Sequence, residues 1–291
     1  MRHIPAAGVR WRMGMSAADL LAYGEDANGK LGSSSSFNTI TYAQSEKAHY
    51  VTLTNDYWIG VYPLTQAQAK RFSQGGNAYL NSGFSDWEGR DRDLYPMEYW
   101  TYQAIRGSIE DGVNWPTTGD KVAGFLQRFR NRTGGMKFDF PTEAQWEFAC
   151  RAGEPGQLYD GSVLYSSGSR VGNARSIVAK LGWIYYTYNE DGSVLEATRT
   201  FPVGLKQPNN WGLYDMIGNV REFCLDWYDV FAENDAVDPR GPDAAKYGTY
   251  RVVRGGSYAT SFFTVRSSWR SGISATYGAA DYGCRLSITI P

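Results

Sequence analysis

The chain has 291 residues, of which 42% are hydrophobic and 15% aromatic, and its formal net charge is −1. This length and composition suffice for the core of one large domain. The near-zero charge and the lack of Lys or Arg runs exclude a basic surface for nucleic acid or for anionic lipid. We therefore expect no nucleic-acid partner, and we expect other partners to be recognised by shape.

The N-terminal residues, 1–5, do not begin the apolar run that a signal peptide or a membrane-spanning helix requires. A chain whose secretion or lipidation segment is missing would start in this way. We therefore expect no direct membrane span and leave open a lipid anchor outside this chain.

The three cysteines, Cys150, Cys224 and Cys284, lie far apart and have no CxxC spacing. This pattern argues against a zinc cluster and against a dense disulfide framework. Buried thiols are favoured, and a single disulfide is left open as the alternative.

The N-terminal third of the chain is predicted to contain short strands and loops. Residues 3–14 are expected to form an edge or short strand, and the Gly/Ser/Asn-rich stretch 24–38 a loop insertion. β-Branched and aromatic residues alternate over 49–59, which predicts a strand. Residues 75–100 are rich in Gly, Asp and aromatic side chains without a period, which is typical of an ordered loop.

Two capping boxes predict helix starts, because a Thr and a Gln three residues later can bond to each other's backbone N–H groups. They are Thr65 with Gln68, whose helix should end near Ser73, and Thr142 with Gln145. Between them, apolar residues spaced i, i+3, i+4 and i+7 predict a third helix. These apolar residues are Val122, Phe125, Leu126 and Phe129.

The stretch 208–228, PNNWGLYDMIGNVREFCLDWY, fits neither a helical nor a strand period throughout, so we expect irregular backbone buried against the core. Buried carbonyls outside a ladder need partners. Asp215, Asn219 and Glu222 could satisfy this backbone or could help to hold a hard cation. Both interpretations stay open.

Upstream, residues 153–200 are expected to be loop-rich, with a short strand or an aromatic ledge, a row of neighbouring aromatic side chains, at 185–188.

Six segments occur in the order of one known family. They are HIPAAGVRWRMG (3–14), IGVYPLTQAQ (59–68), FPTEAQWEFACRAG (140–153), GLYDMIGNVREFCLDWY (212–228), RVVRGGSY (251–258) and GCRL (283–286). On these segments the chain resembles the formylglycine-generating-enzyme (sulfatase-modifying factor) family. The resemblance implies an α+β, C-type lectin-like fold with little regular secondary structure and a small antiparallel sheet with flanking helices. It implies less about activity, because one fold hosts many functions.

The resemblance also implies structural calcium, since members of the family bind this ion with carboxylate, amide and backbone oxygens. The positions that match the first site are Asn173, Ala174, Asp191 and Ser193. The positions that match the second site are Asp215, Gly218, Val220 and Glu222.

The family's enzymes activate oxygen with copper held by two thiolates between RGGS and GFR. This chain has no cysteine between Cys224 and Cys284, and hydroxyl groups cannot replace soft ligands for copper(I). The iron-dependent relatives need a histidine cluster, whereas the chain has only His3 and His49. We therefore expect no copper and no catalysis.

The last 45 residues contain no Lys, Glu, Gln or Met, although these types occur 35 times in residues 1–246. Small, hydroxyl and aromatic residues replace them, and such types are reachable when both leading bases of an AAC or AAT codon are randomised. This composition resembles that of the variable proteins of diversity-generating retroelements, several of which use this lectin-like fold. The alternative is an ordinary β-rich, polar-poor C-terminus.

The resemblance implies a single domain over 1–291, with a variable ligand-binding segment at about 251–286. The expected ligand-binding positions are Ala259, Thr260, Ser261, Phe262, Phe263, Ser271, Gly272, Ser274, Thr276, Tyr277, Gly278, Ala279, Ala280, Asp281 and Tyr282. The aromatic members are expected anchors if they are exposed. Arg266, Trp269 and Arg270 are expected to hold the scaffold beneath them.

We thus expect a receptor-like or adhesin-like binding protein, located at the cell surface or outside the cell, with an unknown protein or cell-surface ligand. The alternative is a formylglycine-generating-like oxidase, or another enzyme of this fold with an altered active site. A plain lectin-like domain with a carbohydrate ligand is disfavoured, because calcium-dependent sugar binding needs several acids and 257–282 contains only Asp281.

Overall fold

The computed structural model describes residues 1–16, 19, 46–72, 92–166, 169–188, 194–230, 234–246 and 248–290. The helices in these ranges are α3 (Gln66–Phe72), α4 (Tyr102–Arg106), α5 (Gly124–Arg132), α6 (Glu143–Arg151), α7 (Ala174–Leu181) and the 3-10 turn η2 (Phe262–Thr264). The strands are β1 (Arg2–Ile4), β2 (Val9–Met13), β3 (His49–Leu53), β4 (Tyr57–Ile59), β5 (Tyr165–Ser166), β6 (Ser169–Arg170), β7 (Tyr186–Tyr188), β8 (Val194–Glu196), β9 (Arg221–Trp227), β10 (Ala236–Val237), β11 (Tyr250–Arg254), β12 (Arg270–Ser274), β13 (Tyr282–Gly283) and β14 (Ser287–Thr289). The elements are short and are joined by irregular backbone, as the sequence led us to expect.

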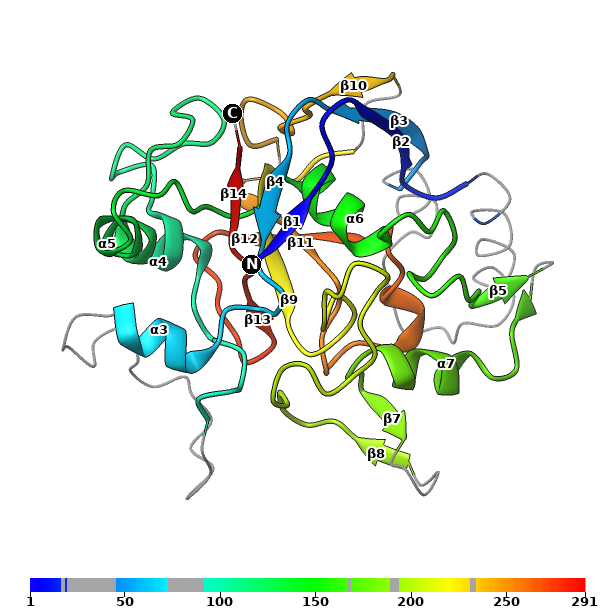
Figure 1. The fold of residues 1–291 in the computed structure, drawn as a ribbon. Helices are drawn as coiled ribbons and strands as arrows, with labels where there is room; N and C mark the ends of the chain where they lie inside the picture. The colour runs from blue at the N-terminus through cyan, green and yellow to red at the C-terminus, as the bar shows by residue number, and fades with distance from the viewer. Residues whose placement is uncertain are drawn as a thin grey trace.

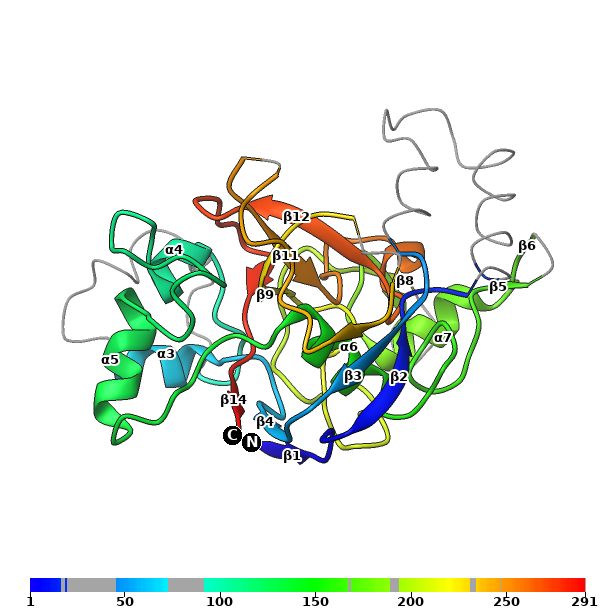
Figure 2. The ribbon, with the colours of Figure 1, turned by 90° about the horizontal axis from the view of Figure 1, so that it is seen from above.

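The two ends of the chain lie side by side in one sheet. β4 is the middle strand, and β1 and β14 pair with it antiparallel on either side. Figures 1 and 2 show the two termini together at this sheet. The outer strands therefore tie the first residues to the last.

A second, central sheet has the strand order β12-β11-β9-β13. Successive side chains of a strand point to opposite faces, and here both faces are covered. Cys224 and Val252 join one hydrophobic cluster, whereas Phe223, Leu225 and Val253 join another. In Figures 1 and 2, helices α3, α4 and α5 lie on one side of this sheet, and α7 with β5, β7 and β8 lies on the other.

The predicted strand over 49–59 is instead two strands, β3 and β4, separated by a turn. Side-chain bonds hold this turn: Thr54 donates its N–H to Asp238 at 2.9 Å, and Asp56 accepts the N–H of Ala6 at 2.8 Å. β3 then pairs with β2 antiparallel and with β10 parallel. The alternation of residue types continues across the turn, so it could not reveal the break.

The capping boxes are confirmed. Thr65 and Gln68 exchange bonds at the start of α3, and Thr142 and Gln145 do so at the start of α6. The predicted third helix is α5, whose Phe125, Leu126 and Phe129 are buried as the spacing indicated. None of the helices in the described part of the chain is both long enough and apolar enough to cross a membrane.

The expectation of irregular backbone over 208–228 is correct for its first half and wrong for its second. Residues 221–227 form β9, one of the two inner strands of the central sheet. From Glu222 to Trp227 every side chain is buried. A strand buried on both faces shows no polar and apolar alternation, which is why the strand period was not visible.

We predict that Thr142→Val, which keeps the shape of the side chain but removes the cap acceptor, lowers the free energy of unfolding by about 1 kcal/mol. Urea titration followed by circular dichroism measures this change. Thr276→Val at an exposed position is the matched control and should change stability by about 0.5 kcal/mol or less. Equal effects of the two substitutions would contradict the assigned cap.

Candidate functional site

The C-terminal segment is held from beneath by buried arginines, each paired with a glutamate from earlier in the chain. The pairs are Arg254 with Glu147, Arg266 with Glu46 at 2.7 Å, Arg270 with Glu143 at 2.5 Å, and Arg285 with Glu222 at 2.9 Å. All eight residues are at most 4% exposed. Trp269 is buried as well, so the predicted scaffold role of Arg266, Trp269 and Arg270 is confirmed.

Above this layer, two parts of the segment meet at Asp281. Ser257 donates its hydroxyl hydrogen to Oδ2 of Asp281 at 2.9 Å, and Arg221 forms an ion pair with the same oxygen. Half-burial, with the nearby charge of Asp281, raises the pKa of Tyr258 to about 12. The Tyr258 phenol is therefore neutral at physiological pH and can donate or accept a hydrogen bond.

Most of the predicted ligand-binding positions reach the surface. Ala259, Thr276 and Tyr277 are exposed, and Tyr277 is 49% accessible. The half-buried positions are Ser261, Ser271, Gly272, Ser274, Gly278, Ala279, Ala280 and Asp281. These exposed and half-buried residues, with Tyr258, are called the variable surface, after the predicted variable segment to which they belong.

Three positions that were predicted to contact a ligand are buried instead. Phe262 packs in the core near α7, with the guanidinium of Arg175 5.6 Å from its ring centre. Tyr282 lies beneath Tyr277, at a ring separation of 5.7 Å. The Thr260 hydroxyl closes a local turn with Ser257. Their tertiary contacts, which composition does not reveal, cover them. Phe263 was also predicted to bind ligand, but its side chain lies outside the described residues.

One aromatic neighbour of the variable surface lies outside the C-terminal segment. Tyr99 is 39% exposed, and its backbone N–H donates to the carbonyl of Ala279 at 3.0 Å. A Cβ atom on Gly278 would lie 2.4 Å from the Tyr99 carbonyl oxygen, so only glycine permits this approach. A glycine at position 278 is compatible with a close backbone approach, but the sequence does not show that Tyr99 is the residue that approaches it.

The carboxylates of the second predicted calcium set are hydrogen-bonded within the protein. Oε1 of Glu222 accepts from Arg285 at 2.9 Å, and Oε2 accepts from the Trp146 indole at 2.6 Å. The carboxylate of Asp215 accepts the backbone N–H of Gly204 at 2.7 Å and a side-chain N–H of Asn219. Arg285 balances the charge of Glu222, whereas burial raises the pKa of Asp215. These contacts favour the interpretation in which the residues satisfy the protein itself, and calcium binding stays a prediction.

The other predicted metal positions are only partly described. Gly218 packs against the backbone of Trp183, and Val220 is buried in the core. Asn173 precedes α7 at an exposed position, whereas Asp191 and Ser193 lie outside the described residues. Across the described ranges, no three His, Cys, Asp or Glu side chains gather in a metal-binding group.

The cysteines are unpaired and buried. Burial raises the pKa of Cys150 to about 12 and also raises the pKa of Cys224 and of Cys284. Each thiol is therefore protonated at neutral pH and acts as a small apolar group. The predicted core position of Cys150 in α6 is confirmed.

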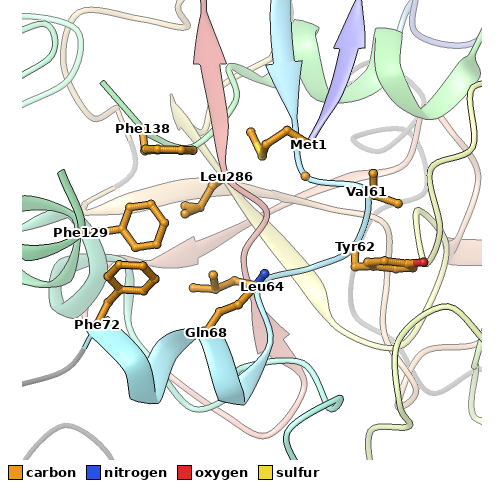
Figure 3. Close-up of a pocket in the computed structure, with 10 residues that line it drawn as sticks. Met1, Val61, Tyr62, Leu64, Gln68, Phe72, Phe129, Phe138 and Leu286 are labelled. Carbon is orange, nitrogen blue, oxygen red and sulfur yellow. The ribbon is translucent and has the colours of Figure 1, made fainter. Parts of the chain in front are cut away.

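An apolar cavity of about 520 Å³ lies between α3, α5 and the terminal sheet. Figure 3 shows Phe72, Phe129, Phe138 and Leu286 converging on it, with Met1 at its edge. The polar side chains that line the cavity are those of Gln68 and Tyr62. Oε1 of Gln68 already accepts the N–H of Thr65. Pockets that select a ligand combine apolar walls with converging polar groups, and this cavity offers few.

The two-cluster core, the short sheets and the paired arginines define a C-type lectin-like protein of the formylglycine-generating-enzyme type. Residues 27–290 match the family described as the sulfatase-modifying factor enzyme 1-like domain. The chain belongs to this family.

Similar proteins differ in what their names state. The formylglycine-generating enzyme of Streptomyces coelicolor is 38% identical over 120 residues, which cover 40% of this chain and 35% of the enzyme. The match thus spans about a third of that relative's length. Treponema denticola variable protein 1 has a TM-score of 0.65 at 20% identity, with 100% of this chain and 95% of that chain covered. PvdO from Pseudomonas aeruginosa has a TM-score of 0.65 at 18% identity, with coverage of 98% and 92%. At these identities the two structures show a shared fold.

We predict that Glu222→Gln, which leaves Arg285 without its charge partner, lowers the free energy of unfolding by about 3 kcal/mol. Urea titrations in excess CaCl2 and in excess EDTA should give the same decrease, because the glutamate serves the arginine. Calcium stabilisation of the natural protein that disappears in the variant would show instead that Glu222 binds calcium.

Proposed function

We propose that the protein binds a protein or cell-surface ligand through the variable surface and performs no catalysis. The observation that carries this proposal is the layering of the C-terminal segment. Exposed small and aromatic side chains lie over buried Arg–Glu pairs. The exposed side chains can therefore be substituted without disrupting these ion pairs. The fold shared with a treponemal protein named as variable supports the same proposal.

The chemistry of the variable surface suits binding. Tyr277 and Tyr258 offer large contact area with few rotatable bonds, and the surrounding Ser, Thr, Ala and Gly residues adapt to a partner. Tyr99 adds a third phenol beside them. Tyrosines among small residues are also typical of antibody paratopes. A diversified surface would encode a repertoire of ligands, and display at the cell surface or outside the cell would bring it to them.

The alternative is an oxidase like the formylglycine-generating enzymes, some of which are 38% identical to part of this chain. Copper chemistry of that kind requires a pair of accessible thiolates. In this chain Thr260 and Val265 lie against Gly256, in the segment that follows RGGS. Neither side chain is a soft ligand, and the three thiols are buried elsewhere in the core. These features favour binding without turnover.

We predict that the combined variant Ala259→Ser, Ser261→Ala, Thr276→Ser and Tyr277→Ser stays folded, with a stability change of at most about 1 kcal/mol. A peptide selected from a random display library against the natural protein should bind this variant at least about tenfold more weakly, because hot-spot tyrosines dominate such contacts. Calorimetric titration measures the dissociation constant.

The matched control for Tyr277→Ser is Tyr50→Ser, since Tyr50 is 42% exposed on β3. The control should leave the affinity unchanged. Unfolding of the combined variant, or equal affinity for most selected peptides, would contradict the proposal.

We also predict that the protein does not convert cysteine to formylglycine. Protein loaded with copper(I) is incubated with oxygen and a cysteine-containing sulfatase peptide, and the product is followed by mass spectrometry. The Streptomyces coelicolor enzyme is the positive control. Conversion by this chain above the background without protein would favour the oxidase alternative.

A further inference from the structure

A second cavity, of about 440 Å³, lies where the start of α6 meets the end of β9 and the start of β12. Acidic and basic side chains line one part of it, and Val230, Pro239 and Pro242 line another. No residue of the variable surface lines this cavity. It therefore differs from the apolar cavity of Figure 3 in having converging charged groups.

Most of the charge around this cavity is balanced within the protein. Glu143 and Arg270 form two parallel bonds, Nε to Oε1 at 2.6 Å and Nη2 to Oε2 at 2.5 Å. Arg270 also donates to the backbone carbonyl of Asp229. The carboxylate of Asp229 pairs with Lys246 at 3.1 Å. These contacts give Glu143 and Asp229 a cation each.

Asp226 differs, because among the described residues it forms no ion pair. Its side chain is 3% exposed, and its Oδ2 accepts the backbone N–H of Glu143 at 2.7 Å. Burial, reinforced by the negative charge of Glu143 and only partly offset by the Arg270 guanidinium, raises the pKa of Asp226 to about 7. A buried carboxylate without a cation is costly, and a cation at this position would remove that cost.

Gly241 packs closely against Asp226 and Trp227 at the cavity wall, and a Cβ atom there would lie 3.0 Å from Cβ of Asp226. A Cβ atom on Gly241 would lie 3.4 Å from Oδ1 of Asp226 and 3.2 Å from the carbonyl oxygen of Trp227. Gly241 has a φ of +68°, which other residues rarely adopt. Oδ1 of Asp226 and the carbonyl oxygen of Trp227 thus both lie beside Gly241 at the cavity wall.

We propose that this cavity binds a primary alkylammonium group, with its nitrogen at Oδ1 of Asp226 and its alkyl chain against Val230, Pro239 and Pro242. An ammonium suits the site better than a guanidinium, because Oδ2 is already engaged by the helix and a single open oxygen cannot form a two-bond fork. The apolar wall favours an aliphatic chain over a bare inorganic cation. The group can belong to a free amine or to a lysine side chain of a polypeptide.

The test uses two probes, n-butylammonium and Nα-acetyl-lysine amide, whose side-chain amine is free. Each is titrated calorimetrically into the full chain at pH 8. At this pH the Asp226 carboxylate is ionised and the amines remain protonated. The natural protein should bind butylammonium saturably, and Asp226→Asn should bind it at least about tenfold more weakly because the charge is lost. The asparagine keeps an oxygen for the Glu143 N–H, so the start of α6 is preserved.

Three controls separate the site from general charge effects. Asp235→Asn removes an equal charge from an exposed residue outside the cavity and should leave the affinity unchanged. n-Butanol, the neutral analogue, should bind at least about tenfold more weakly than butylammonium. Val230→Trp fills the cavity mouth without a change of charge and should also weaken binding, which keeps the test decisive if Asp226→Asn does not fold.

Comparable affinity for the lysine derivative would assign the site to a polypeptide side chain, and binding of butylammonium alone would assign it to free amines. Either result supports the proposal. Absence of saturable binding to the natural protein, or equal affinity in Asp226→Asn, overturns it. Binding of selected peptides at the variable surface involves none of these residues, so the two proposals fail independently.

Discussion

The buried pairing of C-terminal arginines with upstream glutamates is the constraint on which the rest of the structure depends. An unpaired buried charge is costly, so each of these arginines fixes the segment that supplies its glutamate. Glu143 and Glu147 of α6 receive Arg270 and Arg254, which locks this helix against the ends of β11 and β12. Arg285 in turn binds Glu222 of β9 and the carbonyl of Gly60, beside the terminal sheet. One set of charges thus connects the central sheet with both ends of the chain.

Such pairs do not by themselves make a protein very stable, because desolvation offsets much of their attraction. Their value here is geometric. A guanidinium with several fixed partners has one low-energy position, as for Arg254 between Glu147 and the carbonyls of Ser267 and Ser268. The backbone of residues 266–270 is therefore held without help from the side chains that face outward. This arrangement is suited to a surface whose exposed residues differ between related proteins.

The same charge layer explains the amine-site proposal. The start of α6 places Glu143 and the carboxyl group that caps it, Asp226, beside each other. Arg270 forms its ion pair with Glu143 and only partly offsets the effect of burial on Asp226. The carboxyl group of Asp226 therefore lies at the cavity wall without an ion-pair partner among the described residues. A scaffold that pairs its buried arginines with buried carboxylates can contain one further carboxylate without an arginine partner. In the amine-site proposal, that carboxylate binds an external cation.

Local patterns in the sequence determined the helix starts and the family. A capping box such as Thr142 with Gln145 is satisfied by its own four residues, so neighbours in the sequence suffice to identify it. The buried role of Arg266, Trp269 and Arg270 was likewise evident from framework residues within a segment poor in other large polar types. Only the tertiary structure decided which positions of that segment face a ligand. Phe262 and Tyr282 are buried by α7, by the second hydrophobic cluster and by Tyr277, and Tyr99 reaches the variable surface across 180 residues of sequence. It also decided that Glu222 serves Arg285, because a carboxylate's partner depends on what the fold brings within about 3 Å of it, and no spacing along the chain encodes that distance.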